Sequence, residues 1–280
     1  MTSSIERVME QAGELGVRPA LAPAQPVGNL TGRTAGRSTE APQVTLDFAY
    51  LREQGYLTPE DGNRALQEQY RMVKRPLLGH AFSGEGIGPN PANLIQVTSS
   101  IEGEGKTFTA MNLGMSIAME VDFTVVLLDA DLTRRSLTHL VGLEDHPGLT
   151  DLLVSDRLDL SEVLYSTNVP RVRVVPAGTG HPRSTELIAS DAMRRVTREL
   201  AQRYPDRIVI FDSPPLLMDS QAATLSSHVG QLLIVVEAGR TVEKQLKEAL
   251  GHVDQTGTRT GLLLNKSSRG YGSGYYYGGY

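Results

Sequence analysis

From Asn93 onward, short apolar runs alternate with segments in which apolar residues recur at helical spacing. The apolar runs predict strands at 94–97, 124–128, 172–175, 208–211, 232–236 and 261–264. The helical patterns predict helices at 107–119, 190–204 and 242–254. This alternation is typical of a doubly wound, mostly parallel α/β sheet. Ligands of such sheets bind outside the carboxyl ends of the strands.

The residues before this region follow other patterns. Apolar positions in 3–15 have helical spacing and predict a short amphipathic helix. Residues 18–45 are rich in Pro, Ala, Gly, Ser and Thr without a period, which indicates a flexible linker. Residues 46–58 predict a small packed element, and 59–78 a helix.

These patterns divide the chain into four parts. We expect a helix and linker at 1–45, a helical arm at 46–90, an α/β domain at 91–266, and a disordered Gly/Tyr-rich tail at 267–280.

Composition narrows the functional classes. The 280 residues include no Cys, which excludes disulfides, iron–sulfur clusters and thiol catalysis. A net charge of −5 argues against a nucleic-acid partner. Neither a signal peptide nor a long apolar run is visible, so we expect a soluble cytoplasmic protein. Five of the ten Tyr lie within the last ten residues, which suggests a special role for this segment.

The segment Ser100-Ile-Glu-Gly-Glu-Gly-Lys-Thr107 has the spacing of a P-loop, with Ser at the position of the first Gly. Gly103 and Gly105 allow backbone N–H groups to turn toward phosphate oxygens, and the following helix N-terminus favours an anion. Lys106 is placed to reach the β- and γ-phosphates, and the Thr107 hydroxyl to bind Mg²⁺.

A ligand-free tight turn is the alternative explanation of this segment. The order strand, loop, Gly-Lys-Thr and helix favours nucleotide binding instead. We therefore expect ATP and Mg²⁺ to bind here, with nucleotide contacts from Ser100, Gly103, Glu104, Gly105, Lys106, Thr107 and Phe108.

Carboxylates follow two of the predicted strands. Asp129 and Asp131 stand two residues apart, a spacing that projects both side chains to one side of an extended chain. Asp212 ends a later strand, at the position of a Walker B acid that holds Mg²⁺. Each could instead be a turn residue, but their order relative to the P-loop favours a metal–phosphate site.

Together these segments resemble a known family. Ile101–Thr107, Leu-Leu-Asp-Ala-Asp131 and Ile-Phe-Asp-Ser-Pro-Pro215 are similar to the Walker A, A′ and B motifs of bacterial tyrosine kinases, within the MinD/ParA-like P-loop class. The resemblance extends over residues 60–280. It is strongest to stand-alone autokinases of exosortase-associated exopolysaccharide loci, which share the segments Gly-Tyr-Leu-Thr-Pro59 and Lys-Arg-Pro-Leu-Leu78.

Two features depart from the relatives. Thr133 stands where many relatives have Arg, and Arg134 and Arg135 follow it. The Lys near the start of the MinD-type P-loop is also missing, as it is in other bacterial tyrosine kinases.

The resemblance implies ATP:protein-tyrosine phosphotransferase activity. Lys106, Asp129, Asp131 and Asp212 would be the catalytic residues. Thr107, Asp129 and Asp212 would hold Mg²⁺. A tyrosine hydroxyl has a pKa near 10 and needs a carboxylate to accept its proton or orient it. Which of Asp129 and Asp131 serves the tyrosine stays open. The resemblance also implies an adenine contact at Asn265.

The phosphate acceptors would lie in the C-terminal segment, where Gly favours an accessible chain. The acceptor candidates are Tyr271, Tyr275, Tyr276, Tyr277 and Tyr280. A Gly-rich aromatic tail that binds a partner is the alternative. Because the last predicted strand should run parallel to the others, the tail would leave near the catalytic edge. Its length allows attack at its own site or at a neighbour's.

Glu68, Arg71 and Lys74 resemble the E-x-x-R-x-x-R helix through which bacterial tyrosine kinases form rings, with Lys in place of the last Arg. The spacing predicts that these charges share one helix face, although a solvated face would look the same. The implied partners are further copies of the chain, a membrane polysaccharide co-polymerase as activator, and a cognate tyrosine phosphatase. The protein would be cytoplasmic and recruited to the inner face of the membrane.

Two other functions are compatible with these motifs. A ParA/MinD-like switch ATPase would hydrolyse ATP without producing phosphotyrosine. A non-catalytic interaction subunit of a polysaccharide export complex would use nucleotide only to hold an assembly together.

Overall fold

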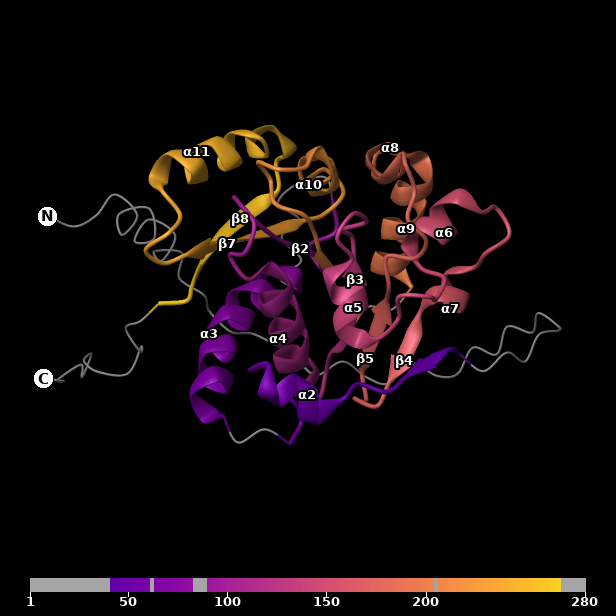
Figure 1. Cartoon of the computed structure of the whole chain (residues 1–280), viewed down its shortest axis with the longest axis horizontal. Coiled ribbons are helices and arrows are strands. Elements are labelled where there is room, and N and C mark those ends of the chain that lie inside the picture. The colour runs from indigo at the N-terminus through magenta and orange to yellow at the C-terminus, as the bar shows by residue number, and fades with distance from the viewer. Residues whose placement is uncertain (1–40, 61–62, 83–89, 204–205, 268–280) are drawn as a thin grey trace, which may run out of the picture. The chain divides into compact units, whose positions relative to one another are not determined.

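The computed structural model describes residues 41–60, 63–82, 90–203 and 206–267 (Figure 1). The predicted 3–15 helix, most of the predicted linker and the five candidate acceptor tyrosines lie outside the described residues. Within the described part of the chain, no helix is both long and apolar enough to span a membrane.

The described residues form an eight-stranded sheet in the order β1-β4-β5-β3-β6-β2-β7-β8. Neighbouring strands are parallel, except that β4 and β5 are antiparallel. The strands are β1 (Gln43–Val44), β2 (Leu94–Ser99), β3 (Thr124–Asp129), β4 (Tyr165–Thr167), β5 (Val172–Val175), β6 (Arg207–Asp212), β7 (Gln231–Glu237) and β8 (Arg259–Asn265). This arrangement confirms the predicted doubly wound, mostly parallel fold.

All six predicted strands are present, most of them longer at their ends than predicted. The two unpredicted strands, β1 and β4, have only two and three residues and are too short to show a period. The linker prediction was wrong at its end, because β1 pairs with β4. The Leu46 N–H then donates to Asn168 Oδ1 at 2.9 Å, and Leu46 is buried.

Helices cover both faces of the sheet (Figure 1). The helices are α2 (Phe48–Glu53), α3 (Arg64–Ala81), α4 (Lys106–Ala118), α5 (Ser136–Val141), α6 (Leu149–Val154), α7 (Leu160–Val163), α8 (Ser184–Ile188), α9 (Asp191–Gln202), α10 (Ser220–Ser226) and α11 (Glu243–Gly251), and a 3₁₀ turn follows at Asp254–Thr256. Val125 and Leu127 of β3 belong to one apolar cluster, whereas Val126 and Leu128 belong to another. Burial on both faces explains why the strands are continuous apolar runs.

Helix α3 begins later than predicted. The Asn63 side chain caps it by accepting the N–H of Leu66 at 3.1 Å, so the helix starts at Arg64 rather than Pro59. Tyr70 and Leu77 of α3 are buried in the same cluster as the residues of α4. The helix predicted as part of an arm therefore packs against the α/β core.

Candidate active site

The P-loop connects β2 to α4, whose N-cap is Gly105. Gly103 and Gly105 have φ angles of 80° and 99°, in the left-handed region that glycine adopts without strain. A Cβ on Gly105 would also lie 2.2 Å from Asn265 Nδ2, so a side chain there would displace the Asn265 amide. These two conformations are what the sequence predicted for a loop that turns its amides inward.

The Glu104 side chain is engaged within the protein, so the predicted nucleotide contact of Glu104 would come from its backbone. Its side chain is buried and accepts the N–H groups of Ile101 at 2.7 Å and of Glu237 at 3.3 Å. The Thr241 hydroxyl also donates to this carboxylate. The side chain therefore secures the loop from within, and only the backbone of Glu104 is left to face a phosphate.

Thr107 and Asp212 come together as the sequence predicted. Thr107 Oγ1 donates to Asp212 Oδ2 at 2.7 Å. Burial and the nearby Asp129 carboxylate raise the pKa of Asp212 from 3.8 to about 8. Its second oxygen, Oδ1, is buried and has no hydrogen-bond partner among the described residues.

The two aspartates that follow β3 have different surroundings. Asp129 Oδ2 accepts the N–H and the hydroxyl of Thr138 at 2.8 and 2.7 Å, and Oδ1 accepts the Asp131 N–H at 3.2 Å. Burial raises the pKa of Asp129 to about 6. Asp131 Oδ1 accepts the Arg134 N–H at 2.9 Å, and burial raises its pKa while the nearby Lys106 lowers it. Both oxygens of Asp129 are thus engaged within the protein.

The residues at this edge fit MgATP. Asp129 and Asp212 are register partners on adjacent strands, and Asp131 lies close enough to raise the pKa of both. Clustered, buried carboxylates favour a bound cation. No group of three or more His or acidic side chains in the described residues forms a metal cage. Mg²⁺ is commonly bound by one or two protein ligands together with phosphates, which Thr107 and Asp212 Oδ1 would allow.

Asn265 and Phe108 contact protein groups in this structure. Asn265 Nδ2 donates to the Glu104 carbonyl at 2.8 Å, so its adenine contact stays a prediction. The Phe108 ring packs against Tyr56, with 5.0 Å between ring centroids. Burial, followed by the charge of Asp212, raises the pKa of Tyr56 to about 12. Tyr56 was missed because nothing in its local sequence places it beside α4.

Two basic residues at the P-loop were also missed. Lys266 Nζ donates to the Gly103 carbonyl at 2.7 Å. Arg134, which follows the A′ aspartates, forms an ion pair with Glu102 of the P-loop. The position of Arg134 directly after the A′ motif could have indicated its contact with the P-loop. The contact of Lys266 depends on where β8 ends, which the local sequence does not show.

The predicted oligomerisation residues do not share one face. Glu68 and Arg71 form an exposed ion pair on α3. Lys74 is buried, and its Nζ contacts the Ser116 carbonyl and Glu120 Oε1, each at 2.6 Å. Each three-residue step rotates the side-chain direction by about 60° on a helix, so Lys74 turns inward toward α4. The prediction for Lys74 was wrong, and that for Glu68 and Arg71 stays a prediction.

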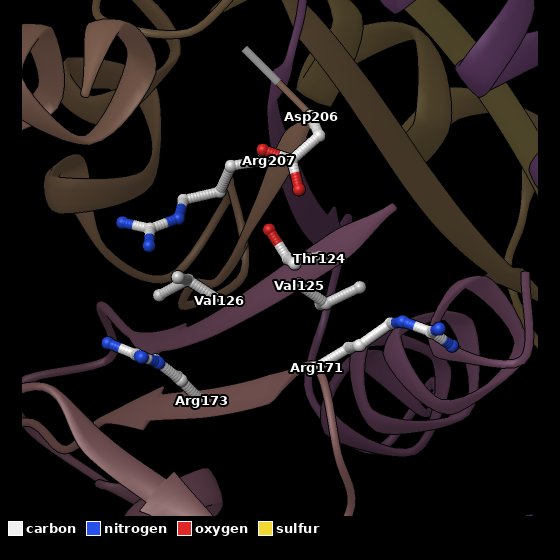
Figure 2. A pocket seen from close by; sticks show the side chains of 7 residues that line it. All are labelled: Thr124, Val125, Val126, Arg171, Arg173, Asp206 and Arg207. Atoms are coloured by element: carbon white, nitrogen blue, oxygen red, sulfur yellow. The ribbon is translucent and has the colours of Figure 1, made fainter. Parts of the chain in front are cut away.

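A cavity of about 260 Å³ lies away from this site, where β3, β5 and β6 begin. Thr124, Asp206 and three arginines help to line it. Figure 2 shows that Arg171 points away from Arg173 and Arg207, so the three guanidinium groups do not converge on one ligand.

Known proteins with similar sequences include bacterial tyrosine kinases, although no family model matches the chain. Tyrosine-protein kinase CpsD of Streptococcus agalactiae is 31% identical over 190 residues, which are 67% of this chain and 81% of that protein. Tyrosine-protein kinase ptk of Acinetobacter johnsonii is 32% identical over 183 residues, covering 64% of this chain but only 24% of that protein.

Solved structures agree with this grouping. The BceF tyrosine kinase domain is 25% identical with a TM-score of 0.62, and the match covers 80% of this chain and 90% of that one. The kinase domain of Escherichia coli ETK has the same fold, with a TM-score of 0.63 at 24% identity, over 83% and 94% of the two chains. MinD of Pyrococcus horikoshii, solved with Mg-ADP, has a TM-score of 0.52 at 22% identity and covers 62% of this chain and 72% of that one. The chain belongs to the bacterial tyrosine-protein kinase family.

Proposed function

We propose that the protein is an ATP-dependent tyrosine autokinase, an ATP:protein-tyrosine phosphotransferase that uses Mg²⁺. The observation that carries this proposal is the meeting of the P-loop, the buried aspartates and the end of β8 at one edge of the sheet. Strand β8 is parallel to β7 and ends at Asn265, whose side chain contacts the P-loop. The tyrosine-rich segment begins six residues later, at Tyr271, so the end of the strand that precedes it lies beside the P-loop.

The environments of the aspartates support a division of roles. Asp129 accepts three hydrogen bonds from within the protein and fixes the Asp131 backbone through the Asp131 N–H. Asp131 Oδ2 accepts no hydrogen bond from the described residues, and the raised pKa of Asp131 suits a proton acceptor. We assign Asp131 as the acceptor of the proton from the tyrosine hydroxyl, and Asp129 as the residue that holds the Asp131 backbone in place.

Phosphoryl transfer in this site would depend mainly on positioning. The phenol oxygen bonds to the γ-phosphorus as the bond to the β-phosphate oxygen breaks, and Asp131 takes the phenol proton. Lys106 and the P-loop amides hold the phosphates in place. Thr107 and Asp212 would hold Mg²⁺, which when bound neutralises charge on the phosphates.

The biological setting is part of the proposal. The resemblance to exosortase-associated autokinases supports a role in exopolysaccharide assembly or export. It also supports activation by a membrane co-polymerase that recruits the protein to the membrane, ring formation, and reversal by a tyrosine phosphatase.

The test compares phosphotyrosine formation from labelled MgATP in three full-length chains. These are the unmodified protein, Lys106→Met, and a variant with the five C-terminal Tyr changed to Phe. We expect label only on the unmodified protein. ATP hydrolysis without phosphotyrosine, even with the activator's cytoplasmic fragment, would favour a MinD-like switch. Intact pathway function in Lys106→Met cells would favour a non-catalytic subunit.

A further inference from the structure

Two successive carbonyls of the P-loop are held by two successive residues at the end of β8. Asn265 Nδ2 donates to the Glu104 carbonyl at 2.8 Å. Lys266 Nζ donates to the Gly103 carbonyl at 2.7 Å. These contacts join segments that are more than 160 residues apart, so no local pattern predicts them.

The direction of these carbonyls fixes the direction of two amides. A trans peptide unit is planar, so its C=O and the N–H of the next residue point in opposite directions. The Gly103 carbonyl shares its peptide unit with the Glu104 N–H, and the Glu104 carbonyl with the Gly105 N–H. Contacts that draw both carbonyls toward β8 therefore turn both amides to the opposite side, where a P-loop binds phosphate oxygens.

The Lys266 ammonium is itself held in place. Glu237 Oε2 accepts from Lys266 Nζ at 3.1 Å and from Arg240 Nη1 at 2.9 Å. Lys266 also has a φ angle of 56°, a left-handed conformation that residues with a side chain rarely adopt. Such a conformation persists where the surrounding contacts determine it.

We propose that Asn265 and Lys266 form a clasp that sets the P-loop amides for phosphate before nucleotide binds. Lys266 is then a positioning residue that acts through the Gly103–Glu104 peptide unit. This inference rests on the proposed function only in requiring that the P-loop binds nucleotide. Lys266 is the cleaner residue to test, because Asn265 is also the predicted adenine contact.

The first experiment measures the Kd of a fluorescent ATP analogue with Mg²⁺ for full-length variants. Lys266→Met keeps the side-chain length but removes the charge, and Lys266→Arg restores a donor. Lys247→Met is the matched control, because Lys247 is an exposed lysine paired with Glu243 on α11. We expect Lys266→Met to weaken binding about tenfold, as for a lost charge-assisted hydrogen bond. The Arg variant and the control should bind like the unmodified protein.

The second experiment separates a clasp from a direct phosphate contact. NMR order parameters of the Glu104 and Gly105 amides are measured without nucleotide, together with the melting temperature. A clasp predicts lower order parameters at these amides in Lys266→Met with an unchanged melting temperature. Weaker binding with unchanged order parameters would instead mean that Lys266 touches the nucleotide directly, and would overturn the clasp.

The outcomes also separate the clasp from the kinase. An unmodified chain that binds the analogue but forms no phosphotyrosine would contradict the kinase while leaving the clasp testable by affinity and order parameters. If Lys266→Met binds the analogue as tightly as the unmodified chain does, and the unmodified chain forms phosphotyrosine normally, the clasp is refuted and the kinase proposal is not.

Discussion

Asp212 is a buried carboxylate whose pKa rises from 3.8 to about 8 because of burial and then the charge of Asp129. The folded state therefore holds the proton more tightly than the unfolded chain. The contribution of Asp212 to the free energy of unfolding is therefore fully present at low pH and is lost as the pH rises from about 4 toward about 8. A bound cation would offset this loss by favouring the ionised form.

Asp212→Asn removes the buried charge and should stabilise the metal-free protein at pH 8. We expect a gain on the order of 1–3 kcal/mol at pH 8 and a much smaller one at pH 4, because near pH 4 the carboxyl is protonated in the folded chain and still partly protonated in the unfolded chain. Thermal unfolding in a chelator at the two pH values measures this difference. The exposed Asp156→Asn serves as the control. An equal effect of Asp212→Asn at both pH values would contradict the assignment of the raised pKa.

At the scale of elements, α4 lies very close to β3. A Cβ on Gly114 of α4 would be 2.8 Å from Leu127 Cδ2. Glycine at this position therefore allows the P-loop helix to pack tightly on the central strands, which fixes the direction of its N-terminus.

Gly114→Val should overpack this contact and lower the free energy of unfolding by about 1–3 kcal/mol. Gly79→Ala in α3 is the matched control, because a Cβ there meets nothing within 4 Å. That change should raise stability by up to about 1 kcal/mol through helix propensity. Urea unfolding measures both. Equal stability of Gly114→Val and the unmodified chain would show that α4 can move away from β3.

Helix α3 contributes two kinds of charged residue. Lys74 Nζ lies at the carboxyl end of α4, against the Ser116 carbonyl and Glu120. Lys74→Met should lower stability by about 1–2 kcal/mol. Arg71→Met, which breaks only an exposed pair, should cost less than about 1 kcal/mol. Urea unfolding measures both losses, and light scattering checks the mass. A change of assembly mass in Arg71→Met but not in Lys74→Met would support the ring prediction.

At the scale of the whole molecule, phosphorylation should change assembly. Each phosphate adds about −1.5 to −2 charges to a chain whose net charge is already −5. We expect the phosphorylated protein to form smaller assemblies than the variant with the five C-terminal Tyr changed to Phe. Light scattering at low ionic strength measures the masses. Equal masses would contradict a ring that loosens on phosphorylation.

Local sequence patterns predicted much of the candidate site. The P-loop, the A′ aspartates and Asp212 each follow an apolar strand, so their place at one edge of a parallel sheet could be predicted. The directions of the Glu104 and Lys74 side chains could not be predicted in this way. The Glu104 carboxylate faces Glu237 and Thr241, and Lys74 faces α4, because of packing partners far away in the chain.

The sequence alone predicted the six longest strands, the helices α3, α4, α9 and α11, and the chemistry of the loops, because periodicity and short-range spacing report local conformation. Only the tertiary structure decided which strands are neighbours. It placed β3 beside β6, so that Asp129 pairs in register with Asp212, and it brought the end of β8 to the P-loop. Periodicity shows that a residue is buried but not which residue it meets, since that depends on contacts between distant segments.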